Sequence, residues 1–195
     1  AQLYADCLGS DFRNYVGDAK RWRRIESLDE FQLWSVKVAL KQRTLRFIER
    51  RLREQRARLG DDRPLPNLRP EVLTIGFARR FAVYKRANLL FQDIERAKRI
   101  LTNPERPVQL VIAGKAHPAD EPGKGILRQL WELSRTPELQ DHVILLEDHD
   151  KNMSGHLIEG CDLWLNGPRR PLERVCPEIE ELGHAKLRER LRPHL

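Results

Sequence analysis

The apolar residues of this chain follow one pattern in its first third and another in the remainder. From Trp34 onward they recur at spacings of three, four and seven residues, which is the period of one face of an α-helix. The helix is predicted to begin near Leu28, after a capping box formed by Ser27 and Glu30, and to end near Gly60. Its apolar stripe consists of Trp34, Val38, Leu45, Ile48 and Leu52. The residues before it predict a few short amphipathic helices.

Beyond a proline-rich connector at residues 61–70, short apolar runs alternate with helical periods. Three prolines in seven residues exclude a regular helix from this connector. Continuously apolar runs such as 108–113 are typical of parallel strands that are buried on both faces. Strands are predicted at residues 72–77, 108–113, 143–147 and 162–165, and helices at 84–101, 124–135 and 152–158. We therefore expect an α/β fold, with a Rossmann-like half of about four parallel strands and flanking helices that follows a helical segment.

These patterns divide the chain into three parts. Residues 1–66 form a helical lead-in with one long amphipathic helix, residues 70–173 form the Rossmann-like βα units, and residues 174–195 form a divergent charged tail. A sheet of only about four strands leaves an open edge, so association through that edge is expected.

Charge by itself leaves the partner of this chain open. The net charge of +7 is compatible with a nucleic acid, a phosphorylated ligand or only an arginine-rich codon bias. The outer face of the long helix carries Arg43, Arg46, Arg50, Arg51, Arg53, Arg56 and Arg58. This face is either a nucleic-acid-binding or membrane-binding surface or, as the pattern favours, a solvated face partly balanced by Glu49 and Glu54.

The cysteines and the hydropathy pattern indicate a cytoplasmic protein without a membrane partner. The three cysteines have no metal-ligand spacing, so reduced thiols are expected. No apolar run reaches the roughly 20 residues of a membrane span.

Cations gather directly after the first predicted strand, where Arg79, Arg80, Lys85 and Arg86 occupy four of eight positions. Ligands of parallel sheets bind outside the carboxyl ends of the strands, and rigidly held positive charge stabilises an anion there. A helix expected to start near Tyr84 would add free N–H groups and the positive end of its dipole. Arg80 and Lys85 therefore predict a phosphate-binding loop.

The loops after the other strands carry weaker signals. Gly114 and Lys115 mark either a close approach of the backbone to a ligand or a plain turn. Asp148 and Asp150 are either general acid and base groups or caps of the following helix. The even spacing of His142, His149 and His156 places them on a strand start, a loop and a helix, so no metal site is expected.

Four motifs in this order resemble the α-glucan phosphorylases, which include the glycogen, starch and maltodextrin phosphorylases, and in particular their short bacterial and archaeal branch. They are residues 75–87, 110–120, 145–150 and 162–173. The resemblance extends from about Leu3 to Glu173 and covers only part of a complete family member.

The resemblance implies a glycosyltransferase B fold and a pyridoxal phosphate cofactor. The family cleaves terminal α-1,4-glucosyl units of an α-glucan with inorganic phosphate and releases glucose 1-phosphate. Arg80 and Lys85 resemble the residues that hold the substrate phosphate, and Arg79 resembles a cation that contacts the cofactor phosphate. Glu173 matches the acid that binds the glucosyl hydroxyls, and Lys115 and His149 fall in the cofactor vicinity.

Two departures from the family pattern change the expected activity. After Glu173 the family continues into a Gly/Ser/Thr-rich loop that ends in the Schiff-base lysine, whereas this chain continues with Arg174-Val175-Cys176. His149 also stands where the family usually has tyrosine. We therefore expect no catalytic lysine, no covalent cofactor and no phosphorolysis from this chain alone. The alternative, from another class, is a basic nucleic-acid-binding or non-catalytic interaction module.

Overall fold

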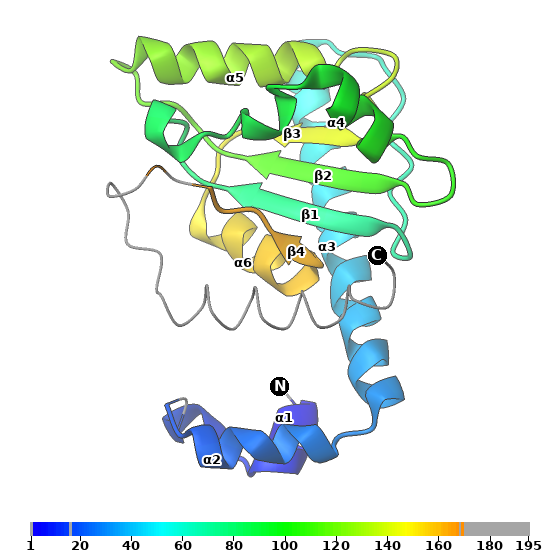
Figure 1. Cartoon of the computed structure of the whole chain (residues 1–195), viewed down its shortest axis with the longest axis vertical. Coiled ribbons are helices and arrows are strands. Elements are labelled where there is room, and N and C mark those ends of the chain that lie inside the picture. Colours follow the sequence, from blue (N-terminus) through cyan, green and yellow to red (C-terminus); the bar gives the residue numbers. More distant parts are fainter. Residues whose placement is uncertain (1, 16, 168, 170–195) are drawn as a thin grey trace.

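The protein is a three-layer α/β structure with a helical N-terminal segment (Figure 1). It is seen in a computed structural model that describes residues 2–15, 17–167 and 169. The strands are β1 Leu73–Ala78, β2 Val108–Ala113, β3 Val143–Leu146 and β4 Leu163–Trp164. They are parallel and lie in the order β3-β2-β1-β4. The predicted α/β fold is confirmed, and each strand lies within one residue of its predicted bounds.

Helices cover both faces of the sheet. The long helix α3 (Glu30–Leu59) and α6 (Lys151–Gly160) pack on one face, and α4 (Ile94–Leu101) and α5 (Glu121–Leu133) pack on the other. Alternate residues of β2 face opposite layers, with Val111 in the α3 and α6 cluster and Ile112 in the α4 and α5 cluster. All residues of β2 and β3 are buried, which explains why these strands read as continuous apolar runs.

The start of α3 differs from the predicted capping box. Asp29 is the N-cap, and its carboxylate accepts a hydrogen bond from the Gln32 N–H at 3.0 Å. Ser27 ends a preceding 3₁₀ helix and donates its hydroxyl to the Arg24 carbonyl at 2.7 Å, so it is not available as a cap. The predicted end is confirmed, because Gly60 terminates α3 in the left-handed conformation with φ of 63°.

Only the second half of α3 packs on the sheet. Leu45, Ile48 and Leu52 are buried as predicted, whereas Trp34 is 63% exposed. The first turns of α3 connect the sheet to the N-terminal helices (Figure 1). Trp34 belongs to the predicted apolar stripe, but it is not covered by the described residues, because a helical period defines a face without supplying what packs against it.

The predicted helix at 84–101 is wrong over its first ten residues. Two short 3₁₀ turns, Val83–Lys85 and Leu89–Phe91, precede α4, which begins only at Ile94. Arg86 has a left-handed backbone with φ of 50°, which stops a helix. The N-cap of α4 is Asp93, which accepts a hydrogen bond from the Arg96 N–H at 3.0 Å.

The N-terminal segment consists of short helices, as predicted. They are α1 (Gln2–Leu8), the 3₁₀ turn Phe12–Tyr15, α2 (Ala19–Trp22) and the 3₁₀ turn Arg23–Ser27. The rings of Tyr4, Phe12 and Trp22 pack together, with 5.9 Å between the centroids of Tyr4 and Trp22.

A side chain of α3 occupies part of the β3 edge. The Gln55 amide donates to the Leu145 carbonyl at 3.1 Å and accepts from the Glu147 N–H at 3.0 Å. These two hydrogen bonds replace those that a further strand would make there. Association through a sheet edge stays a prediction, and it now concerns the edge formed by β4.

Candidate functional site

The backbone on both sides of Arg80 is anchored to the sheet. The N–H of Arg79 donates to the Ala113 carbonyl at 3.1 Å, and the N–H of Phe81 donates to the Lys115 carbonyl at 3.0 Å. The Phe81 side chain is fully buried, whereas the Arg80 side chain is exposed. The chain therefore holds a solvent-accessible guanidinium on a rigid backbone at the carboxyl end of β1.

Gly114 permits this close crossing of two backbone segments. A Cβ atom at residue 114 would lie 2.2 Å from the Arg79 carbonyl oxygen and 2.9 Å from the Phe81 ring. The close approach considered for Gly114 is thus made by the backbone of Arg79 itself. Because residue 114 has no side chain, residues 79–86, here called the cationic loop, can lie against the end of β2.

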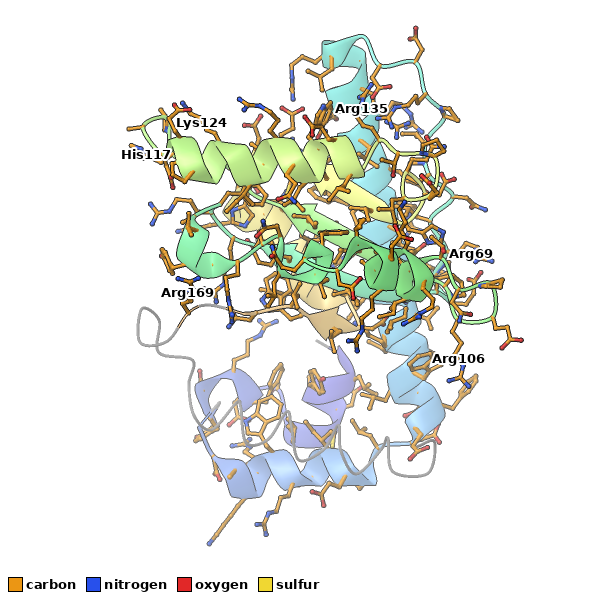
Figure 2. All side chains as sticks on the ribbon, turned by 45° about the horizontal axis from the view of Figure 1, so that its top comes forward. Arg69, Arg106, His117, Lys124, Arg135 and Arg169 are labelled. Carbon is orange, nitrogen blue, oxygen red and sulfur yellow. The ribbon has the colours of Figure 1, made fainter. Side chains whose placement is uncertain are left out.

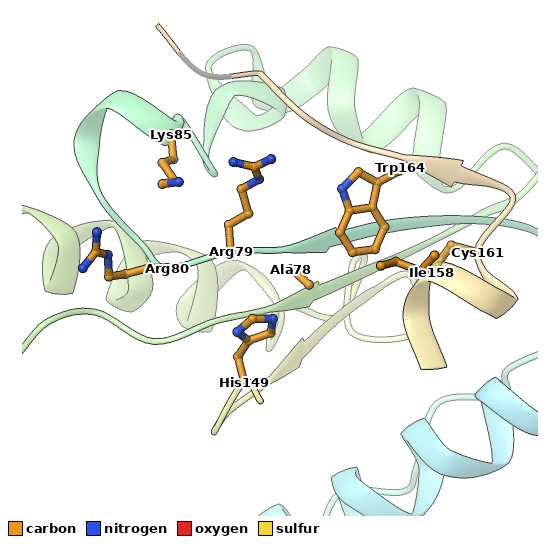
Figure 3. Close-up of a pocket in the computed structure, with 8 residues that line it drawn as sticks. All are labelled: Ala78, Arg79, Arg80, Lys85, His149, Ile158, Cys161 and Trp164. Carbon is orange, nitrogen blue, oxygen red and sulfur yellow. The ribbon is translucent and has the colours of Figure 1, made fainter. Parts of the chain in front are cut away.

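Three of the four predicted cations line one cavity of about 630 Å³, here called the cationic cavity (Figure 3). It is lined by Ala78, Arg79, Arg80, Lys85, His149, Ile158, Cys161 and Trp164. Arg79, Arg80 and Lys85 gather at one end, and the apolar side chains of Ile158 and Trp164 lie at the other (Figure 3). A volume of this size is typical of small-molecule sites.

Lys85 reaches the cavity from a 3₁₀ turn instead of the first turn of an α-helix. The expected contribution of a helix dipole is therefore wrong, since α4 begins at Ile94. Two bonds brace the cationic loop against the segment after β4. Arg86 Nε donates to the Gly167 carbonyl at 2.7 Å, and the Arg169 N–H donates to the Tyr84 carbonyl at 2.7 Å.

His149 faces the same cavity from the opposite side to Lys85 (Figure 3). Its Nε2 lies 2.7 Å from Ser154 Oγ. Burial lowers the pKa of the imidazole, Asp150 opposes that shift and Lys115 adds to it. Asp150 is the N-cap of α6 and accepts from the Met153 N–H at 2.6 Å, which confirms the capping interpretation of this residue.

Comparison with known proteins places this arrangement in a family. The chain is 42% identical over 166 residues to a maltodextrin phosphorylase of Thermococcus litoralis. The aligned residues make up 85% of this chain and 20% of that protein. It is 37% identical over 177 residues to glycogen phosphorylases of Aquifex aeolicus and Mycobacterium tuberculosis, which is 88% of this chain. The chain belongs to the α-glucan phosphorylase family. No family model matches it.

The chain spans about a fifth to a quarter of the length of these curated relatives, between 20% and 26%. The resemblance seen in the four motifs is confirmed, including the match to bacterial and archaeal phosphorylases. The comparisons give no support to the nucleic-acid-binding alternative. On the arginine face of α3, three arginines form ion pairs with carboxylates of the same protein. Arg43 pairs with Glu159, Arg51 with Glu54 and Arg58 with Glu147.

One phosphorylase-like residue of the described part of the chain, Lys115, lies outside the cationic cavity. Lys115 lines a neighbouring hollow of about 530 Å³ that is bounded by Lys124, Arg128 and Trp131 of α5. Glu173 lies outside the described residues, as does the predicted tail at 174–195. Figure 2 shows His117, Lys124 and Arg169 on the side of the molecule where the strands end, and Arg69 and Arg106 on the opposite side.

Several contributors to the site were not anticipated from the sequence. Trp164 and Ile158 form the apolar end of the cationic cavity, and Ser154 contacts His149. The apolar character of Ile158 at the end of the predicted helix 152–158 and of Trp164 within the predicted strand 162–165 offered only a weak signal. Nothing in the spacing of Ser154 pointed to a role.

Neither a metal cluster nor a membrane span is found in the described part of the chain. Among residues 2–15, 17–167 and 169, no group of three or more His, Cys, Asp or Glu side chains is placed to hold a metal ion. His142 Nδ1 lies 3.1 Å from the Val108 carbonyl, and the His156 ring stacks on Phe47. Within the same residues, every helix is too short or too polar to cross a bilayer.

Proposed function

We propose that this chain carries the phosphate-binding wall of an α-glucan phosphorylase active site. The proposed reaction transfers a terminal α-1,4-glucosyl unit to inorganic phosphate and yields glucose 1-phosphate. The observation that supports it best is the convergence of Arg79, Arg80 and Lys85 on one cavity at the carboxyl end of β1. Family membership gives this cavity its expected ligand.

The three cations suit a phosphate dianion. A guanidinium offers paired N–H donors that match two phosphate oxygens, and an ammonium adds a compact charge. Arg80 makes no ion pair with any described residue, so its charge is available to a ligand. We assign Arg80 and Lys85 to the substrate phosphate, and Arg79 to the cofactor phosphate.

The same cavity suits the phosphate end and the ring of pyridoxal phosphate. A cationic end beside an apolar wall of Ile158 and Trp164 matches a phosphorylated aromatic molecule. When bound, this cofactor supplies a phosphate group that donates and accepts a proton. Arg79 would hold that group, with Lys115 and His149 nearby, and Glu173 would bind the glucosyl hydroxyls.

The free thiols support a cytoplasmic location for this reaction. Cys7 and Cys161 are both unpaired with any other cysteine of the described residues, and Cys161 is buried at the cavity wall. Burial raises the pKa of the Cys161 thiol to about 12, so this group stays protonated beside the cations.

Binding of inorganic phosphate tests the first half of the proposal. Titration of the chain with phosphate, followed by NMR, should shift resonances of the Arg80 and Lys85 side chains. Arg80→Ala and Lys85→Ala should each weaken binding about tenfold or more, as expected for a hydrogen bond to a charged group. Arg96→Ala, at an exposed position of α4, is the matched control and should bind like the wild type. Absence of saturable binding would contradict the assignment.

A chimera tests the reaction itself. The matched segment of the Thermococcus litoralis maltodextrin phosphorylase would be replaced by the corresponding residues of this chain. The chimera should form glucose 1-phosphate from maltodextrin and phosphate. Arg80→Ala within it should lower kcat/KM for phosphate about 100-fold, because the charge acts in the transition state as well as in binding. An active chimera that is indifferent to Arg80→Ala would refute the role given to this residue.

A further inference from the structure

We propose that His149, held by Ser154, is a further phosphate-binding residue that donates a hydrogen bond to a phosphate group bound among Arg79, Arg80 and Lys85. This inference rests on the proposed function and adds to it a neutral donor on the opposite wall of the cavity. It assigns Ser154 as a positioning residue, because Ser154 acts through the imidazole.

The sheet topology brings His149 to the cations. His149 follows β3, whereas Arg79 and Arg80 follow β1, and β2 lies between these two strands. All three side chains nevertheless line the same cavity, with the imidazole on the side opposite Lys85 (Figure 3). A ligand that engages the cations therefore has the imidazole ring facing it.

The contact with Ser154 determines which nitrogen is available. A neutral imidazole has one donor nitrogen and one acceptor nitrogen. Since Nε2 lies 2.7 Å from Ser154 Oγ, Nδ1 is left for the ligand. If the Ser154 hydroxyl donates to Nε2, Nδ1 carries the proton and becomes a donor, which is the tautomer that an anion selects. Ser154 is itself fixed in α6, where its N–H donates to the Asp150 carbonyl at 3.0 Å.

Burial and the neighbouring Lys115 cation lower the pKa of His149 and so favour its neutral form. The charged or titratable groups around the imidazole come from three segments. Lys115 follows β2, the three cations of the cavity follow β1, and the Cys161 thiol follows α6. The carboxylate of Asp150 opposes them but is engaged as the cap of α6. A bound phosphate dianion opposes these cations and so raises the pKa of the His149 imidazole.

Inorganic phosphate and the phosphate group of pyridoxal phosphate share this chemistry. Both present oxygens to the same donors, so the experiment uses them in separate arms. Pyridoxal, which has the ring but no phosphate, is the third arm.

The experiment follows the His149 ring by NMR as a function of pH, with and without each ligand. Without ligand, the nitrogen shifts should report the tautomer that carries the proton on Nδ1. With inorganic phosphate or pyridoxal phosphate, the titration midpoint should rise by about one pH unit or more. Pyridoxal should leave it in place. A response to inorganic phosphate only would assign His149 to the substrate, and a response to pyridoxal phosphate only would assign it to the cofactor.

Variants separate this role from a merely structural one. His149→Ala should weaken phosphate binding about tenfold, and His149→Gln, which keeps a donor, should recover most of that loss. Ser154→Ala should keep the ring but shift its tautomer toward a proton on Nε2, with a smaller loss of affinity. His142→Gln, at the opposite end of β3, is the control and should bind phosphate normally.

Each of the remaining outcomes would contradict either the proposed function or the role given to His149. If the wild type binds neither phosphate ligand, the proposed function and this inference both fail. If the wild type binds phosphate but His149→Ala binds equally well, and the His149 midpoint does not move, only this inference fails. The same holds if Ser154→Ala leaves the tautomer unchanged. A folded NMR spectrum of His149→Gln guards against loss of binding through unfolding.

Discussion

Two cations of this protein, Lys41 and Arg80, differ in whether the fold supplies a partner for the charged group. On the α3 side of the sheet, Lys41 is 4% exposed and donates to the Val72 carbonyl at 2.6 Å and to Asp162 at 2.5 Å. At the carboxyl ends of the strands, the backbone of Arg80 is anchored but its guanidinium is exposed. A cation that is buried and paired stabilises the fold, whereas an exposed cation on a fixed backbone is ready for a ligand.

The largest expected difference is between Lys41→Met and Arg80→Met. Loss of Lys41 leaves the Asp162 carboxylate without its cation, which should lower the free energy of unfolding by about 3–5 kcal/mol. Arg80→Met should change that free energy by no more than about 0.5 kcal/mol while it weakens phosphate binding about tenfold or more. Urea unfolding measures both. Equal destabilisation by the two variants would abolish the distinction between a structural and a ligand-binding cation.

Gly114→Ala should damage the cationic cavity through the backbone. The new methyl group would meet the Arg79 carbonyl, so the loop must move at a cost of about 2 kcal/mol, and phosphate affinity should fall with it. Gly125→Ala in α5 is the matched control, since no atom lies within 4 Å of its added Cβ. The control should stabilise the protein by about 0.5–1 kcal/mol. A similar gain for Gly114→Ala would show that the close approach of the Arg79 backbone does not require glycine at residue 114.

Gln55→Ala should loosen the α3 side of the sheet and expose the β3 edge. Two hydrogen bonds to the β3 edge are lost, which should lower the free energy of unfolding by about 1–2 kcal/mol and increase self-association. Thermal unfolding and sedimentation measure the two effects. Gln42→Ala, on the exposed face of the same helix, should show neither.

The last expected effect is a pH dependence that comes from Asp61. Hydrogen bonds from Arg63 at 2.9 Å, together with nearby Arg135, hold the pKa of this buried carboxyl well below its ordinary range. The folded pKa is therefore below the unfolded value, so this stabilisation is present above about pH 4 and is lost as the pH falls toward the folded pKa. The stability advantage of the wild type over Asp61→Asn should shrink by about 1–2 kcal/mol between about pH 6 and about pH 2.5.

Exposed Asp62 provides the comparison for this titration. Asp62→Asn should leave the stability profile parallel to that of the wild type over the same pH range. A profile of Asp61→Asn that also runs parallel to the wild type would show that the Arg63 contact does not stabilise the ionised carboxylate.

The strands were predictable because burial on both faces leaves a local signature. Every position of β2 must be apolar or internally hydrogen-bonded, and its predicted bounds at 108–113 are those observed. The single polar residue, Gln109, is satisfied by the Arg69 backbone and by Thr74 Oγ1 at 2.9 Å. The end of α3 was equally predictable, since Gly60 adopts the left-handed conformation that glycine favours.

The segment between β1 and α4 was misread because tertiary contacts override its helical period. Ala87 and Phe91 are buried in the core, and Arg86 turns left-handed where its side chain reaches the Gly167 carbonyl. Such a contact joins residues that are 81 positions apart, so no local window contains it. For the same reason, no local pattern joins His149 to the cations that follow β1, and only the family resemblance pointed to a shared site.

The sequence by itself determined the parallel α/β sheet, the family and the cations that follow β1, because burial periodicity and contiguous motifs are local properties. Only the tertiary structure decided that Arg79, Arg80, Lys85 and His149 share a cavity while Lys115 faces another hollow. The physical reason is that the order of parallel strands determines which loops meet at their carboxyl ends. That order is set by packing across the whole sheet.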